Sequence, residues 1–212
     1  MGTISKGILG GFSGTIGTVI GGSWKGIDYM RSQPSKKSFN PTQSQLEQQA
    51  KFRLVIKFLG SMGGLVALGF GNMAAQMTGQ NSAMSYILKS AVTGVYPNYT
   101  ILYPQVAISR GELPAALNPT AVAAAGGLIN FSWTNNTGVG KAKATDLALL
   151  AVYCEDYNQC IYTTGSAARS AGTDSLNVSF FSGKTVQTYI GFISADGYDI
   201  AGSIFTGQHT VL

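Results

Sequence analysis

The sequence is short of charge. Only 11% of its 212 residues are Asp, Glu, Lys or Arg, against roughly 25% in an ordinary soluble domain. A dispersed monomer relies on surface charge to stay in solution, whereas a subunit covered by other copies of itself needs less. The low charge therefore favours a self-associating protein over a freely soluble monomer.

Histidine and cysteine are almost missing. His209, the only histidine, has no cysteine or carboxylate beside it in the sequence, which excludes a local catalytic dyad or zinc site. Cys154 and Cys160 could face each other across a hairpin, but a disulfide requires an oxidising compartment, and we expect two free thiols. These shortages predict a protein that is not an enzyme and uses no metal or cofactor.

Long apolar runs are also scarce. Glycines interrupt the apolar residues after Lys6, so we expect no secretory signal peptide and a cytoplasmic or virion location. Residues 59–77 are uncharged and about as long as a membrane span. Their glycines and amides supply too little hydrocarbon for a lipid-facing helix, and no transmembrane segment is expected.

Glycine and basic charge are what the chain has in excess. It contains 28 glycines, nearly twice the average frequency of about 7%. Residues 1–60 hold eight Lys or Arg against two acidic residues, a charge of +6, whereas the remainder carries −1. A basic segment ahead of a near-neutral body suits an anionic partner such as nucleic acid. The alternative is a solvated basic face.

The first 33 residues are too rich in glycine for a stable helix, because each interior glycine costs about 1 kcal/mol relative to alanine. We predict a glycine-kinked β-hairpin over residues 15–32. Residues 17–21 are superficially similar to a phosphate-binding loop, but the terminal Gly-Lys-Ser/Thr of that motif is absent. The simpler interpretation is that these glycines allow bends in an extended chain.

Aromatic and basic residues alternate within this hairpin, where Trp24, Lys25, Tyr29 and Arg31 fall close together. Such groups stack on bases and neutralise phosphates. We predict a nucleic-acid or anion contact at five residues: Trp24, Lys25, Arg31, Lys36 and Lys37. The alternative is that Trp24 lies in a core and the cations face solvent.

Helical patterning begins at Thr42, which with Gln45 matches a capping box. Apolar residues at helical spacing follow: Phe52, Val55, Ile56 and Leu59. Weaker helical stretches cover residues 65–77 and 82–92. Alternating apolar residues over 96–109 then predict a strand, and the residues after Pro114 resemble a linker.

The last part of the chain reads as all β, except that the alanine-rich residues 119–127 could be extended or briefly helical. Strand-like runs separated by turn signals occupy six ranges: 128–134, 147–154, 160–164, 176–180, 186–195 and 198–205. This pattern is typical of a sandwich of immunoglobulin or fibronectin type. We predict a mixed, mainly β fold with two domains: residues 1–117, containing the hairpin, helices and a strand, and residues 118–212, the sandwich.

Five strings of the sequence stand out together: GTIGTVIGGSWKGIDYMRS at 14–32, AKF at 50–52, DLALLAVY at 146–153, RSAG at 169–172 and GFIS at 191–194. They resemble the DUF6266 family, a group of uncharacterised Bacteroidetes proteins. The resemblance covers nearly the whole chain. It implies a Bacteroidetes bacterium or one of its phages as the source, and it implies no catalytic residue.

Two functions are consistent with these features. The first is a non-enzymatic, self-assembling homo-oligomer, such as a phage virion or capsid-like coat subunit with a basic N-terminal segment. The second is a bacterial binding module whose sandwich recognises a glycan or a protein. Five tyrosines are candidate contacts for it: Tyr153, Tyr157, Tyr162, Tyr189 and Tyr198. Calcium binding at Glu155 and Asp156 is disfavoured, because the alternating ligands and glycine of an EF-hand loop are missing.

Overall fold

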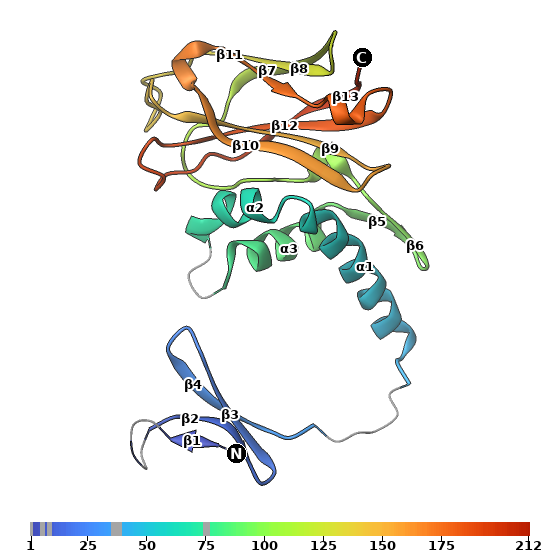
Figure 1. The fold of residues 1–212 in the computed structure, drawn as a ribbon, viewed down its shortest axis with the longest axis vertical. Helices are drawn as coiled ribbons and strands as arrows, with labels where there is room; N and C mark the ends of the chain where they lie inside the picture. Colours follow the sequence, from blue (N-terminus) through green and yellow to red (C-terminus); the bar gives the residue numbers. More distant parts are fainter. Residues whose placement is uncertain (1, 5–6, 8–9, 35–39, 74–76) are drawn as a thin grey trace. The chain divides into compact units, whose positions relative to one another are not determined.

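The computed structural model describes residues 2–4, 7, 10–34, 40–73 and 77–212 (Figure 1). The chain divides into two compact units, residues 1–42 and residues 43–212. The described residues are mainly β, with antiparallel sheets and three α-helices, which confirms the predicted fold class at this level. The expected boundary at 117/118 falls inside the second unit.

The first unit is a four-stranded antiparallel sheet in the order β1-β2-β3-β4. Its strands are β1 (Thr3–Ile4), β2 (Phe12–Ile16), β3 (Val19–Trp24) and β4 (Ile27–Ser32). The predicted hairpin is confirmed as β3 and β4. Lys25 and Gly26 close it with φ values of 49° and 81°, the positive φ that a two-residue hairpin turn requires.

Three helices open the second unit: α1 (Gln43–Gly60), α2 (Gly63–Gly69) and α3 (Gly79–Ser90). α1 begins where the capping pattern predicted. Its buried face consists of Val55, Phe58 and Leu59, whereas the predicted apolar positions Phe52 and Ile56 are half-exposed. The face of α1 that packs into the core is therefore offset by about one residue from the face that the spacing of apolar residues predicts.

α2 is shorter than the predicted stretch 65–77. It ends at Gly69, where a Cβ atom would lie 2.4 Å from the carbonyl oxygen of Ile108, so the chain passes too close there for any other residue. A 3₁₀ turn over Gly71–Met73 follows, and residues 74–76 of the predicted helix lie outside the described residues.

The strand predicted over 96–109 is wrong in its second half. Strands β5 (Val92–Val95) and β6 (Asn98–Ile101) form a hairpin, and a 3₁₀ turn over Tyr103–Gln105 follows, with Pro104 in its first positions. Proline lacks the N–H that a ladder needs and fits the start of a helical turn. Alternation continues past Ile101, but pairing stops there.

Seven strands complete the second unit: β7 (Leu117–Ala124), β8 (Leu128–Thr134), β9 (Leu147–Cys154), β10 (Gln159–Ala168), β11 (Thr173–Asn177), β12 (Thr185–Ile193) and β13 (Ile204–Thr210). They form two antiparallel sheets, β11-β8-β7 and β10-β9-β12-β13. The alanine-rich stretch is thus extended. The run predicted over 198–205 is wrong, since the strand there begins at Ile204. That the sandwich is of immunoglobulin or fibronectin type stays a prediction.

Strand β9 explains why the helices and the sandwich form one unit. Its residues Leu149, Ala151 and Tyr153 pack with the helices, while Leu150 and Val152 pack with the three-stranded sheet. The sheet β10-β9-β12-β13 is therefore the middle of three layers, with helices on one face and the sheet β11-β8-β7 on the other (Figure 1). A strand buried on both faces is a continuous apolar run rather than an alternating one.

Candidate interaction surface

The first unit buries very little of its sheet. Among the described residues of 1–42, only Gly21 is buried. Large apolar side chains lie exposed on it: Ile4, Ile16, Val19, Trp24, Ile27, Tyr29 and Met30. Small sheets need an apolar face packed against another element to be stable, and clustered exposed apolar groups mark interaction sites. This sheet is the strongest candidate for an interaction surface.

The β3–β4 register gathers aromatic and basic groups on one face of the sheet. Trp24 lies opposite Ile27, Gly22 opposite Tyr29, and Ile20 opposite Arg31, and residues directly opposite share a face. The aromatic-basic face therefore consists of Ile20, Trp24, Ile27, Tyr29 and Arg31.

Gly22 has a steric role on this face. A Cβ atom at Gly22 would lie 3.0 Å from the Tyr29 ring and hydroxyl, so the tyrosine lies across the glycine. Trp24 is 54% exposed, and Arg31 is also exposed. The face thus offers two aromatic rings and a guanidinium, the groups that stack on bases and pair with phosphates.

The other residues of the predicted contact lie elsewhere. Lys25 is in the hairpin turn at the end of the face rather than on it, while Lys36 and Lys37 lie outside the described residues. The structure therefore brings Trp24, Tyr29 and Arg31 together on one face. Sequence reasoning missed Ile20 and Ile27, although their even spacing from Trp24 and Tyr29 was the available signal.

The opposite face of the sheet is apolar around Phe12. The Phe12 ring lies against Gly21, where a Cβ atom would come within 2.6 Å of its Cε2. Met30 lies opposite Gly21 across the β3–β4 pair and is 72% exposed. Gly17 lies in the turn between β2 and β3, with φ 59°. The glycines of residues 17–21, whose spacing resembles a phosphate-binding loop, therefore belong to hairpins.

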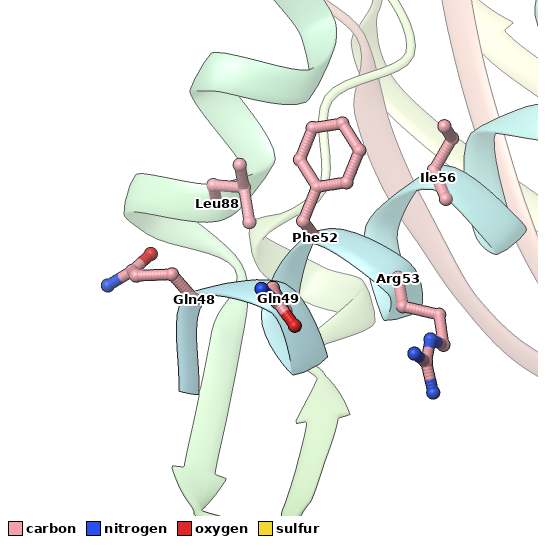
Figure 2. A pocket seen from close by; sticks show the side chains of 6 residues that line it. All are labelled: Gln48, Gln49, Phe52, Arg53, Ile56 and Leu88. Carbon is pink, nitrogen blue, oxygen red and sulfur yellow. The ribbon is translucent and has the colours of Figure 1, made fainter. Parts of the chain in front are cut away.

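A second apolar surface lies between α1 and α3 in the other unit. Figure 2 shows Phe52 and Ile56 projecting from successive turns of α1, with Leu88 reaching toward them from α3. Together with Gln48, Gln49 and Arg53 they line a groove of about 570 Å³. Phe52 and Ile56 are half-exposed, so the groove is open to solvent.

An aromatic cluster lies at one end of the sandwich. The rings of Tyr157 and Phe180 stand 5.5 Å apart, and Lys184 Nζ lies 5.5 Å from the Tyr157 ring centre. Lys184 also pairs with Asp156 at 3.0 Å. The acidic turn therefore has a cationic partner within the chain. Sequence reasoning missed Phe180, because nothing in its local pattern distinguishes an exposed phenylalanine from a buried one.

Of the five tyrosines predicted to contact a ligand, two are buried. Tyr153 and Tyr189 lie in the core between helices and sheet, so they present nothing to a large partner. Tyr157 and Tyr198 are exposed, and Tyr162 is partly buried. Burial on a two-sided strand is the reason, since alternate residues there face a second layer instead of solvent.

A small pocket of about 110 Å³ lies beside Tyr153, lined by apolar residues such as Phe58 and by polar ones such as Lys57, Glu155 and Asn158. The Tyr153 hydroxyl donates to Asn158 Oδ1 at 3.1 Å. Burial, together with the nearby Glu155 charge, raises the pKa of Tyr153 to about 12. The hydroxyl therefore stays protonated at neutral pH and acts as a donor rather than as a base.

The remaining sequence candidates are the two cysteines and the side chains that could hold a metal. Cys154 and Cys160 are free thiols, as predicted. Within those residues, no three His, Cys, Asp or Glu side chains come together in a way that could hold a metal. None of the described helices alone is long and apolar enough to cross a bilayer. α1 and α2 meet the length and composition criteria only as a pair, and that pair is bent by 95°.

Comparison with known proteins identifies the family. A search of curated proteins finds no match. The family model described as "Family of unknown function (DUF6266)" matches residues 11–207. That range includes β2, β3 and β4, the helices and nearly all of the sandwich. Because the match covers most of the chain, the protein belongs to the DUF6266 family.

Proposed function

We propose that this protein is a non-enzymatic, self-associating structural protein, of the kind that forms a phage virion or capsid-like coat. The observation that carries the proposal is the sheet of residues 1–42, whose described residues include a single buried one, Gly21. Covering such a surface with other copies removes apolar area from water, which is the main driving force of association. The low charge of the chain, 11%, fits the same interpretation.

The test is the size of the full-length protein in solution. Sedimentation velocity across a concentration series, with electron microscopy of the same samples, is expected to show oligomers that grow into ordered particles or tubes. A protein that sediments as a monomer at every concentration and forms no particles contradicts the proposal. Particles would support the coat role, and a small closed oligomer would support self-association while contradicting a coat.

The aromatic-basic face supports a nucleic-acid contact as part of this role. We expect Trp24→Ala to weaken binding of a single-stranded oligonucleotide by about 1–3 kcal/mol, the value of one stacked base. Arg31→Ala should reduce the slope of log affinity against log salt by about one. Fluorescence anisotropy at several salt concentrations measures both effects.

Tyr198→Ala is the matched control for the nucleic-acid contact, because Tyr198 is an exposed aromatic residue of the other unit. Its affinity for the oligonucleotide should equal that of the wild type. If Trp24→Ala binds as tightly as the wild type, or if Tyr198→Ala weakens binding equally, the aromatic-basic face is not the contact.

A second candidate function is a bacterial binding module, favoured by the exposed cluster of Tyr157 and Phe180. Exposed aromatic rings beside a cation form a platform on which a sugar ring can lie. A glycan-array screen is expected to give hits that Phe180→Ala abolishes and that Phe52→Ala, a substitution of an exposed phenylalanine in α1, retains. An array without hits contradicts the glycan-binding version.

A further inference from the structure

Strand β4 is an open edge of the N-terminal sheet. All six residues of β4 pair one by one with β3, and among the described residues no further strand follows β4 in the sheet order. The Gln33 N–H donates to the Thr18 carbonyl at 2.7 Å, so residues 18 and 33 form a hydrogen-bonded pair. Because such pairs alternate along an antiparallel ladder, Ile27, Tyr29 and Arg31 direct their backbone groups toward β3.

The intervening residues, Asp28, Met30 and Ser32, therefore direct their N–H and C=O groups toward the open edge. All six residues of β4 are exposed. A strand edge of this length with apolar side chains is a template for pairing with another strand. Natural sheets usually protect such an edge with charged side chains, lysine above all, or with proline or a bulge. β4 contains neither lysine nor proline, and its two charged residues, Asp28 and Arg31, are of opposite sign.

We propose that β4 pairs antiparallel with β4 of a second copy, about a two-fold axis that passes beside Met30. This inference rests on the self-association proposed above and names its interface. The two sheets then form one continuous eight-stranded sheet whose central hydrogen bonds come from the outward groups of Asp28, Met30 and Ser32.

Side-chain charge selects this register among the symmetric ones. In a two-fold antiparallel pair, residues directly opposite lie on the same face, and the axial residue faces its own copy. An axis at Asp28 places two carboxylates together, and an axis at Arg31 places two guanidinium groups together. Like charges directly opposite are destabilising.

Two central registers remain, with the axis at Tyr29 or at Met30. The Tyr29 axis places Asp28 opposite Met30 and Arg31 opposite Ile27, so both charges face apolar partners. The Met30 axis places Arg31 opposite Tyr29 twice, as a cation–π pair, and Asp28 opposite Ser32. It also buries Met30, the most exposed of the large apolar residues in this sheet, against its own copy.

A two-fold axis perpendicular to the sheet keeps equivalent faces on the same side. The aromatic-basic faces of both copies would therefore lie next to each other and double the number of stacking and phosphate contacts along one surface. Binding of a long oligonucleotide by the dimer would then exceed that of a short one, because both halves can be occupied at once.

The test compares Met30→Lys with Val139→Lys in the full-length protein by sedimentation equilibrium. Met30→Lys places like charges opposite each other at the axis and should weaken self-association by about tenfold or more. Val139→Lys adds the same charge at an exposed residue of the other unit and should leave self-association unchanged.

A second variant keeps the proposal testable if Met30→Lys disturbs the sheet. Under mild oxidation Met30→Cys should form a disulfide-linked dimer, whereas Asp28→Cys, four residues away from its own copy in this register, and the wild-type protein should not. A wild-type monomer contradicts both proposals. Self-association that persists in Met30→Lys without cross-linking of Met30→Cys contradicts the β4 interface alone, and cross-linking of Asp28→Cys contradicts the register.

Discussion

Replacing Arg169 with methionine is expected to lower the free energy of unfolding by about 3–5 kcal/mol, the cost of breaking a buried ion pair by removing one partner. Arg169 and Asp146 are fully buried, with Nε to Oδ2 at 3.0 Å. The guanidinium also donates to Asn136 Oδ1 at 2.7 Å and to the Pro114 carbonyl at 2.9 Å. Its removal leaves a buried carboxylate without its cation.

Urea denaturation followed by circular dichroism measures this loss. Arg110→Met is the matched control, because Arg110 lies over the Tyr86 ring at 4.6 Å but is exposed, so its replacement should cost no more than about 1 kcal/mol. Replacing both members of the buried pair with apolar residues should cost less than Arg169→Met alone. Equal stability of Arg169→Met and the wild type would contradict the network.

Phe58→Ala is the second large effect expected, at about 3–5 kcal/mol. Phe58 is fully buried and meets Tyr153 of β9 edge to face, with ring centres 4.7 Å apart. Because this contact joins α1 to the middle sheet, the helices and the sandwich should lose stability together. The helical dichroism and the Trp133 fluorescence, read in a Trp24→Phe background, should shift to the same lower urea midpoint.

Phe52→Ala is the control in the same helix, since the Phe52 side chain is half-exposed and its loss should cost no more than about 1 kcal/mol. If Phe58→Ala separates the two signals into different transitions, the helices and the sandwich are independent, and the predicted boundary at 117/118 would describe the folding better than the one at 42/43.

Much of the local structure could be predicted because it depends on residues that are neighbours in the sequence. Lys25 and Gly26 form a two-residue turn between strand-like runs, which defines the β3–β4 hairpin. The bounds of β8 and β9 follow from apolar runs between turn signals. The closeness of Trp24, Tyr29 and Arg31 in the sequence was also enough to bring them into one candidate site, but only the hairpin register places them on one face.

The three-layer arrangement could not be predicted, for a physical reason. β9 is apolar at nearly every position. Such a run predicts burial on both faces but does not indicate which layer covers each face. β13 was misplaced for the opposite reason, because its residues Gly207, Gln208 and His209 lack strand-like chemistry and are extended only because they pair with β12. Tertiary pairing, rather than local preference, decides both cases.

The open edge of β4 was likewise invisible in the sequence, because it depends on which residues hydrogen-bond to β3. The backbone N–H and C=O groups of Asp28, Met30 and Ser32 point away from β3, whereas those of Tyr29 and Arg31 point toward it. The distinction emerges only from the register between β3 and β4, and it is what makes the proposed assembly specific enough to test.

Amide hydrogen exchange in β4 of the assembled wild-type protein tests the central claim most directly. The β4 interface predicts that the outward amides of Met30 and Ser32 become as protected as the inward amides of Tyr29 and Arg31 when the protein concentration rises. Rapid exchange at Met30 and Ser32 at every concentration, with Tyr29 and Arg31 protected, would contradict it.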